Sequence, residues 1–384
     1  MKVYLDNAAT TPVDERVIEL MTKVLKENYG NPSSIHAHGR KSRTLIEKSR
    51  KKVAAALGVT PGEILFTSGG TEADNMALQC AVKDLGCNHI ITSPIEHHAV
   101  LYTAERLAQE GSVHLSLVNI LPNGHVDIAH LRQLLEEHKD KTSLVSLMHA
   151  NNEIGNMIDL KEVGGICEEF KAYFHTDTVQ TIGHWDIKPK ECGVHFLAAS
   201  AHKFNGPKGI GFIYVDENVQ VKPMILGGSQ ERNMRGGTEN LVGIVGLAKS
   251  LEISLAEMGE MKERILGFRK RMIERLTSEI EGVVVNGDYN GKTNYIPLNI
   301  SFPAHKDGEM LLFNLDIAGV SASGGSACSS GSNIGSHVLR ALNADSSKSS
   351  IRFSFGKYNT MEEVDFTVDR LVEIFSPSKK EVTA

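Results

Sequence analysis

The sequence predicts an α/β protein with a large domain built on a mostly parallel sheet and a smaller α+β domain. Between about residues 13 and 215, apolar runs of strand length alternate with segments of helical spacing. This alternation is typical of a parallel sheet with helices on both faces. After about residue 245 the pattern changes to a long charged amphipathic helix followed by further strands and helices. We therefore expect a large domain over residues 13–250 and a small domain formed by residues 1–12 and 251–384.

The individual elements follow from local patterns. Six short apolar runs predict strands in the large domain: EILF, HIIT, SLVSLM, AYFHT, HFLAAS and IGFIYV, which begin at residues 63, 89, 143, 172, 195 and 210. Helical spacing covers residues 13–28, 41–57, 72–84 and 98–110. We expect Thr11 to cap the first helix, with Pro12 in its first turn, and Gly58 to end the second. In the small domain, strands at 295–302 and 350–356 and helices at 308–318 and 361–375 are expected.

Composition and charge narrow the class of protein. The 384 residues are 41% hydrophobic and 23% charged, which is ordinary for a soluble globular chain. The formal net charge of −6 leaves no general basic surplus for nucleic acid, and the basic stretch at residues 39–58 is interpreted as a solvated helix face. No run approaches the ~18 apolar residues of a membrane span, and the first residues lack an apolar signal segment. We expect a cytoplasmic protein with no membrane or direct nucleic-acid partner.

Five of the predicted strands are followed at once by residues that can bind a ligand. Ligands of open α/β sheets lie beyond the carboxyl ends of the strands. The five segments are TSGGTEADN from residue 67, SPIEHHAV from 93, HANNEIG from 149, DTVQ from 177 and HK from 202. The paired glycines and Thr71 at a helix start can hold a phosphate, although Glu72 and Asp74 there also suit an ordinary helix start.

Two lysines in the segment SAHKFNGPKGIG, residues 200–211, are candidates for chemistry. A nucleotide-binding phosphate loop is one interpretation, but that pattern opens a helix, whereas these glycines lead into an apolar strand. A Schiff-base lysine of a pyridoxal-phosphate enzyme is the other. Asp177 precedes Lys203 by 26 residues, and a carboxylate at such a strand end can keep the ring nitrogen of that cofactor protonated. Alone, Asp177 also fits a strand-end cap. We assign Lys203 as the reactive amine and Lys208 as a turn residue.

The five cysteines are an odd number without a CxxC pair, so the sequence indicates neither a disulfide framework nor a zinc site. Cys80 and Cys167 lie in helical patterns and are interpreted as structural, while Cys87 and Cys192 fit either role. Cys328 lies in SASGGSACSSGSNIGS, which has the composition of a mobile loop. Local sequence leaves both a catalytic and an incidental role open for this thiol.

The succession of motifs resembles the cysteine desulfurases, a family of fold-type-I pyridoxal-phosphate enzymes. The resemblance runs almost from end to end and is carried by YLDNAATTP, GNPSSIHAHG, FTSGGTEADN, EHHAV, NNEIG, HTDTVQ, SAHKFNGPKGIG, RGGTEN, GSACSS and IRFSFGKYNT. It implies the fold-type-I transferase architecture, with the cofactor in the large domain and a catalytic cysteine loop in the small one. The short tail after Phe375 departs from family members with a longer extension that docks an iron–sulfur scaffold, and VSASGGSAC differs slightly from the commonest family pattern.

The resemblance also implies the site residues. Lys203 would form the Schiff base, Asp177 would pair with the ring nitrogen, Gln180 would bind the phenolic oxygen, and His97 would stack on the ring as a candidate proton shuttle. The phosphate ligands would be Gly70, Thr71, Ser200, His202 and, from the other subunit of a homodimer, Thr238. Asn152 and Arg352 would bind the substrate carboxylate, a task that suits the forked donors of arginine.

In this family pattern the Cys328 thiolate would attack the sulfur of L-cysteine, release L-alanine and hold a persulfide for an acceptor in iron–sulfur cluster, thio-cofactor or tRNA biosynthesis. No resident metal is expected, and Cys328 is a candidate transient iron–sulfur ligand. A selenocysteine lyase is the alternative enzyme, since it needs the same cofactor site. A non-catalytic sulfur-carrier or scaffold-binding protein is the alternative of another class, although it would not need Lys203, Asp177 and Arg352 together.

Overall fold

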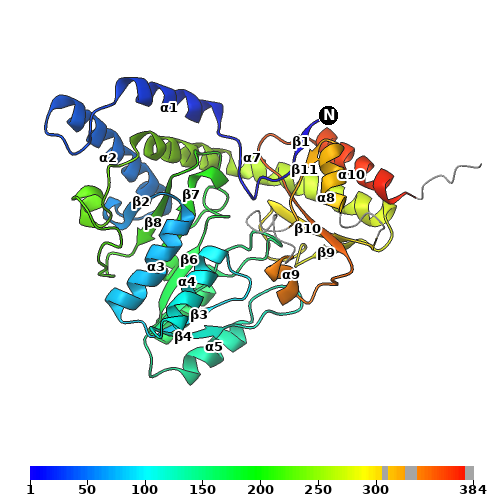
Figure 1. The fold of residues 1–384 in the computed structure, drawn as a ribbon, viewed down its shortest axis with the longest axis horizontal. Helices are drawn as coiled ribbons and strands as arrows, with labels where there is room; N and C mark the ends of the chain where they lie inside the picture. Colours follow the sequence, from blue (N-terminus) through cyan, green and yellow to red (C-terminus); the bar gives the residue numbers. More distant parts are fainter. Residues whose placement is uncertain (305–309, 325–334, 377–384) are drawn as a thin grey trace, which may run out of the picture. The chain divides into compact units, whose positions relative to one another are not determined.

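The computed structural model describes residues 1–304, 310–324 and 335–376, which form two compact units (Figure 1). The large unit comprises residues Thr10–Asn151 and Asn156–Met258, and the small unit comprises Met1–Ala9, Asn152–Gly155 and Gly259–Ala384. The short segment Asn152–Gly155 belongs to the small unit because Arg352 donates to the Asn152 carbonyl at 3.0 Å and Asn294 N–H donates to the Gly155 carbonyl at 2.8 Å.

A seven-stranded sheet forms the centre of the large unit. Its order is β2-β8-β7-β6-β5-β3-β4; strands β3 to β7 run parallel, and β8 is antiparallel to both its neighbours. The strands are β2 (Ile64–Thr67), β3 (His89–Thr92), β4 (His114–Leu117), β5 (Ser143–Ser146), β6 (Tyr173–Asp177), β7 (Phe196–Ser200) and β8 (Gly211–Val215). The predicted mostly parallel α/β architecture is confirmed, and each of the six predicted strands is present. The edge strand β4 was not predicted, because its short sequence HLSL is largely exposed.

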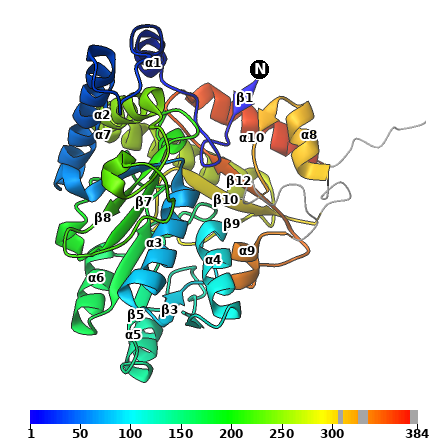
Figure 2. The same ribbon diagram turned by 60° about the vertical axis from the view of Figure 1, so that its left-hand side comes forward.

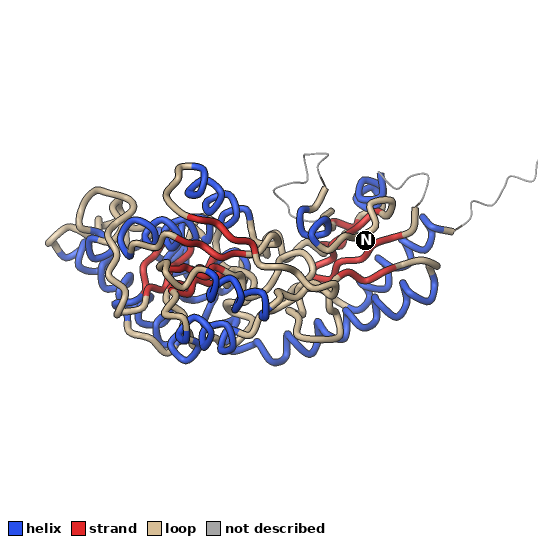
Figure 3. Tube along the Cα trace, turned by 90° about the horizontal axis from the view of Figure 1, so that it is seen from below, coloured by secondary structure: helices blue, strands red, loops and turns tan. Residues whose placement is uncertain are grey.

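Helices cover both faces of this sheet, as Figures 1, 2 and 3 show. Alternate strand residues pack into two hydrophobic clusters: Leu65, Ile90 and Leu144 face α3 and α4, whereas their neighbours Phe66, Ile91 and Val145 face α2, α5, α6 and the start of α7. The helices are α1 (Glu15–Glu27), α2 (Ala37–Leu57), α3 (Gly70–Leu85), α4 (His98–Gln109), α5 (Ile128–Glu137), α6 (Leu160–Glu169) and α7 (Leu241–Glu279). Short 3₁₀ turns occupy Pro61–Glu63, Lys190–Cys192, Ala201–Lys203 and Gln230–Asn233.

Two predictions about the first helices need correction. Asp14, and not Thr11, caps α1, because the Asp14 carboxylate accepts from Arg16 N–H at 3.0 Å while the Thr11 hydroxyl donates to the His202 carbonyl. In the basic stretch, Arg50 is not solvated: it is buried and donates to both carboxylate oxygens of Glu231 at 2.7 Å. The predicted stop at Gly58 is confirmed, with φ of 70° at the end of α2.

The small unit contains two small sheets. β1 (Val3–Tyr4) pairs in parallel with β11 (Val320–Ser321), and β10 (Pro297–Phe302) pairs antiparallel with β12 (Ser349–Ser354) and β9 (Val284–Asn286). The described helices are α8 (Leu311–Ile317), α9 (His337–Ala341) and α10 (Met361–Phe375), the last of which matches the predicted closing helix and begins with a Thr360–Glu363 capping box. Within the described ranges, no helix is both long and apolar enough to cross a membrane.

Candidate active site

The segment after β2 forms a narrow cradle at the start of α3. Gly70 is buried, and a Cβ on it would lie 2.5 Å from the Val179 side chain and 3.7 Å from that of Ser200, the last residue of β7. A larger residue at position 70 would therefore close the space in front of the first N–H groups of α3. Free N–H groups at a helix start bind phosphate, so these residues fit the phosphate of a cofactor. Thr71, the next predicted ligand, is exposed at the same helix start.

The turn that carries Lys203 is held by the N-terminal segment of the large unit. The Thr11 hydroxyl donates to the His202 carbonyl and accepts from Asn205 N–H, both at 2.9 Å, and His202 Nδ1 lies 3.1 Å from the Thr10 hydroxyl. Asn205 has φ of 60°, a left-handed conformation that asparagine tolerates better than most residues. These contacts fix the backbone at Lys203 and leave its side chain half-buried, whereas Lys208 is exposed. This difference supports the assignment of the reactive amine to Lys203.

Asp177 ends β6 with its carboxylate buried. Oδ1 accepts from Val179 N–H at 2.8 Å. Burial raises the pKa of Asp177 to about 6, against the opposing effects of the Val179 N–H and of the positive charge of Lys203. A carboxylate held away from water needs a cationic partner, and the protonated ring nitrogen of pyridoxal phosphate is such a partner. The chemistry of the donor set therefore fits the cofactor at its ring as well as at its phosphate.

Two further buried acids lie near Asp177. Asp74 in α3 and Glu96 before α4 interact electrostatically with Asp177, and ligand atoms of Asp74, His97 and Asp177 all lie within 4.8 Å of one another. Burial, followed by the charges of Asp177 and Glu96, raises the pKa of Asp74 well above its ordinary value. Asp74 Oδ1 also lies 3.4 Å from Nε2 of buried His175, whose pKa burial lowers to about 3.

This environment favours the neutral form of Asp74 and of His175, because burial raises the pKa of the acid and lowers that of the imidazole. Of the two coupled carboxyl groups, Asp177 is the one whose negative charge the surroundings stabilise, because the Val179 N–H and Lys203 both lower its pKa. Sequence reasoning missed this burial, because an acid near the start of a helix is common for a different reason.

Glu96 makes the free energy of unfolding depend on pH, and a single substitution can isolate this contribution. It accepts from the Ser93 hydroxyl at 2.7 Å and from Met148 N–H at 2.9 Å, yet burial raises its pKa from 4.5 to about 8. The native state therefore holds a proton that the unfolded chain has already released, so the free energy of unfolding falls as pH rises from about 4.5 to about 8.

We expect Glu96→Gln to remove the part of this decrease in the free energy of unfolding that Glu96 causes. The amide can accept from Met148 N–H and donate to the Ser93 hydroxyl, so both contacts persist. Between about pH 6 and about pH 8, wild type should lose of the order of 1–2 kcal/mol more than the variant in urea unfolding. The exposed Glu27→Gln should behave as wild type. Parallel pH profiles for wild type and Glu96→Gln would show that Glu96 titrates normally.

The remaining predicted residues of the large unit are placed as follows. Gln180 is buried, three residues after Asp177, and His97 caps α4 by accepting from Ala99 N–H at its Nδ1, at 3.1 Å. Burial, followed by the charges of Lys203 and Lys208, lowers the pKa of His202 to about 4, so this imidazole is neutral. Thr238 is exposed.

In the small unit, Arg352 and Asn152 are in direct contact. Arg352, on β12, is 1% exposed; Nη1 donates to the Asn152 carbonyl at 3.0 Å and Nη2 donates to Asp6 Oδ1 at 2.9 Å. Its Nε is buried and has no hydrogen-bond partner among the described residues. A buried donor without an acceptor is costly even when the guanidinium charge is paired with Asp6, and a substrate carboxylate is an acceptor of the right chemistry.

Cys328 lies outside the described residues, but both flanks of its segment are described. Ser323 exchanges both backbone hydrogen bonds with Arg352, at 3.2 and 2.7 Å. On the other flank, the Ser336 hydroxyl donates to Glu153 Oε2 at 2.5 Å, next to Asn152. The described residues on the two flanks therefore contact Arg352 on one side and Glu153, the neighbour of Asn152, on the other.

The four described cysteines are poor nucleophiles, because their surroundings disfavour the thiolate form. Burial raises the pKa of Cys80, Cys87 and Cys167 to about 12, and it also raises the pKa of half-buried Cys192. A thiol of high pKa supplies little thiolate near neutral pH. All four are free thiols.

Comparisons with known proteins agree with this geometry. Residues 3–366 match the family Aminotransferase class-V. The chain is 45% identical over 391 residues to "Cysteine desulfurase IscS" of Dictyoglomus turgidum, covering 99% of this chain and 98% of the relative. It is 44% identical over 378 residues to "Cysteine desulfurase IscS" of Methanosarcina thermophila, covering 97% and 91%. Among solved structures, a "NIFS-LIKE PROTEIN" matches with a TM-score of 0.90 and 37% identity, covering 98% of this chain and all of that one.

Fold and site together define a pyridoxal-phosphate-dependent enzyme of the class-V aminotransferase type. Within that class, the chain belongs to the cysteine desulfurase family. The predicted fold-type-I architecture, the enzyme class and the cofactor are confirmed.

Proposed function

We propose that the protein converts L-cysteine into L-alanine and holds the released sulfur as a persulfide on Cys328. The observation that carries the proposal is the pairing of buried Asp177 with the half-buried Lys203 in one unit, which a binding protein or sulfur carrier would not require. The relatives named as cysteine desulfurases support the choice of substrate.

In the large unit, each residue would act on one part of the cofactor. The Lys203 amine would bind it covalently, Asp177 would hold the proton on its ring nitrogen, and Gln180 would donate to its phenolic oxygen. Gly70, Thr71, Ser200 and His202 would bind its phosphate. When bound, pyridoxal phosphate supplies an electron sink that accepts the electron pair of the broken C–S bond.

His97 is the proposed ring-stacking residue and proton shuttle. Its Nδ1 accepts from Ala99 N–H, so a proton for transfer would sit on Nε2. Ligand atoms of the buried acids Asp74 and Asp177 lie within 4.8 Å of one on this imidazole. The shuttle would move protons at the substrate carbon atoms, while Lys203 would serve as the second base.

In the small unit, Arg352 and Asn152 would bind the substrate carboxylate, and Cys328 would act as nucleophile. Its thiolate would attack the substrate sulfur, so that an S–S bond forms as the C–S bond breaks; the carbon skeleton then gains a proton and leaves as alanine. The backbone pairing of Ser323 with Arg352 supports this assignment, because the cysteine segment starts where the carboxylate would be held.

The assay that tests the proposal is alanine release from cysteine by the yellow holoenzyme. Stoichiometric alanine with retained sulfur supports it, whereas an enzyme that releases no alanine from cysteine contradicts it. Selenocysteine in place of cysteine tests the lyase alternative: much faster alanine release from selenocysteine, with Cys328 dispensable, would favour that reading.

Arg352→Lys gives a test of the carboxylate site. Lysine keeps the positive charge but loses the planar fork of donors, so we expect the KM for cysteine to rise by roughly 10–100-fold while the cofactor absorption stays normal. Asp6→Asn is the matched control, because it removes the negative charge beside Nη2 but leaves an acceptor oxygen and the guanidinium in place. An unchanged KM in Arg352→Lys would place the carboxylate elsewhere.

The proposal also covers the oligomeric state, the cellular location and the sulfur acceptor. We propose a homodimer in which Thr238 reaches the phosphate of the other subunit; its exposure in the single chain, and that of Ile35 (90%) and Leu226 (81%), is consistent with a surface covered by a partner. We also propose a cytoplasmic location, since all described cysteines are free thiols. The persulfide would pass to an acceptor protein in iron–sulfur cluster or thio-cofactor biosynthesis.

A further inference from the structure

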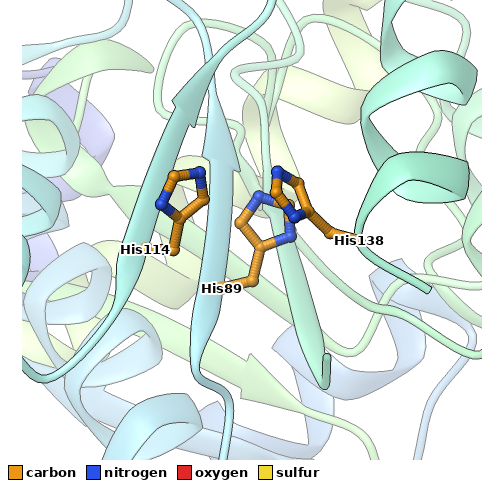
Figure 4. A group of neighbouring side chains, drawn as sticks. All are labelled: His89, His114 and His138. Carbon is orange, nitrogen blue, oxygen red and sulfur yellow. The ribbon is translucent and has the colours of Figure 1, made fainter. Parts of the chain in front are cut away.

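Three histidines gather at one edge of the large sheet (Figure 4). His89 begins β3, His114 begins β4 and lies opposite it in register, and His138 ends α5. The ring centroid of His138 lies 4.4 Å from that of His89 and 4.7 Å from that of His114. The centroids of His89 and His114 are 5.3 Å apart. The three residues come from three separate elements, so the cluster is a product of the fold.

This cluster is separate from the cofactor site. The proposed cofactor ligands follow the carboxyl ends of β2, β6 and β7 or precede α4, whereas His89 and His114 occupy the first positions of β3 and β4. In a parallel sheet, these are opposite ends of the strands. The chemistry proposed above makes no use of these histidines.

Burial favours the neutral form of His89 and of His114, which is the form that binds metals. Burial, and then the charges of His138 and His114, lower the pKa of His89 to about 3. Burial, followed by the charges of His138 and Lys141, also lowers the pKa of His114. Asp140 opposes the shift at His89 without overcoming it. Rings this close cannot all carry a proton, and the neutral imidazole is the metal ligand.

We propose that His89, His114 and His138 bind a divalent transition-metal ion of the zinc type, with water as the fourth ligand. Ligand nitrogens of the three residues all lie within 4.8 Å of one another. A tetrahedral ion with Zn–N bonds of about 2.05 Å needs them about 3.3 Å apart. His114 is exposed and His138 half-buried, so rotation of these two rings can close the difference and leave the water position open to solvent.

His89 is the fixed member of the site. Its two ring nitrogens lie 2.9 Å from the hydroxyls of Ser143 and Ser116. On binding, one nitrogen exchanges its serine for the ion, and the other keeps its serine as the partner that orients the ring. The ion would join the edge strand β4, which pairs only with β3 among the described strands, to both β3 and the end of α5. Its expected effect is therefore to stabilise this edge of the sheet.

Zinc binding to the holoenzyme tests the proposal. After equilibrium dialysis, we expect wild type to hold one more equivalent of zinc per subunit than His114→Gln or His138→Gln. Zinc should also raise the Tm of wild type and have a clearly smaller effect on either variant. His38→Gln is the matched control, because His38 is an exposed histidine that stacks on Tyr29 and belongs to a different element. It should retain both effects.

Cobalt(II) provides an independent readout, because three imidazoles and a water around it give visible absorption bands. Wild type and His38→Gln should show these bands, and His114→Gln should lack them. Since His114 is exposed, its replacement leaves the core intact, and normal cofactor absorption would verify this. Equal zinc content in wild type and both cluster variants would overturn the proposal and assign any bound zinc to the Cys328 thiol or the cofactor. Absence of bound zinc from wild type would overturn it as well.

Discussion

Cys328→Ser is expected to bind pyridoxal phosphate normally, to change its absorption on addition of cysteine as wild type does, and to release almost no alanine. The cofactor and substrate would be bound by Lys203, Asp177, Asn152 and Arg352, none of which the substitution touches. A serine hydroxyl is far less acidic than a thiol and attacks sulfur poorly, so the rate of alanine release should fall by on the order of a thousand-fold or more.

The four described cysteines supply the controls for this experiment. Cys192→Ser is the best matched, because Cys192 is half-buried and its replacement costs little packing; it should retain near-normal alanine release. Buried Cys80, Cys87 and Cys167 should keep activity but lose stability of about 1–3 kcal/mol through a buried hydroxyl. Normal alanine release by Cys328→Ser would exclude the persulfide mechanism.

Lys203→Ala is expected to lose the covalent link to the cofactor and nearly all turnover, again by roughly a thousand-fold or more, while the fold is retained. The side chain of Lys203 is half-buried in a polar turn, so its removal opens no cavity in the hydrophobic core. The turn itself is held by the Thr11 hydroxyl, which contacts the backbone of His202 and Asn205, and by His184 Nε2, which donates to the Lys203 carbonyl at 3.1 Å. These contacts do not depend on the side chain at position 203.

Lys208→Ala is the matched control, since Lys208 lies in the same segment and is exposed. Borohydride reduction of the holoenzyme followed by peptide mapping should place the cofactor on Lys203 in both wild type and Lys208→Ala. A label on Lys208 would reverse the assignment.

Much of the fold was accessible from the sequence because its signals are local. The buried strands β2, β3, β5, β6, β7 and β8 are short runs with a marked apolar content. The carboxyl ends of β2, β6 and β7 bring Gly70, Asp177, Ser200 and Lys203 to one edge of the sheet. The edge strand β4 lacks this signal because one face and one side are exposed. Threonine is a common helix-capping residue, but the Thr11 hydroxyl donates to the His202 carbonyl in the Lys203 turn instead. These two residues are 191 positions apart in the sequence.

The features that sequence reasoning missed depend on how elements pack. Asp74 looks like an ordinary acid near a helix start until α3 is placed against β6, which buries it beside Asp177 and His175. The segment Asn152–Gly155 follows a strand of the large unit, yet its backbone bonds to Arg352 and Asn294 assign it to the small one. The three clustered histidines are separated by more than twenty residues from one another, so no local pattern marks them.

The most direct test of the proposed function locates the sulfur after one round of reaction. The holoenzyme is mixed with cysteine, quenched with an alkylating reagent and digested, and each cysteine peptide is weighed by mass spectrometry while alanine is counted in the same sample. We expect one additional sulfur atom on the peptide that contains Cys328, in an amount equal to the alanine formed, and none on the peptides of Cys80, Cys87, Cys167 and Cys192. Alanine formed with an unmodified Cys328 peptide, or with the sulfur on another cysteine, would contradict the proposed mechanism.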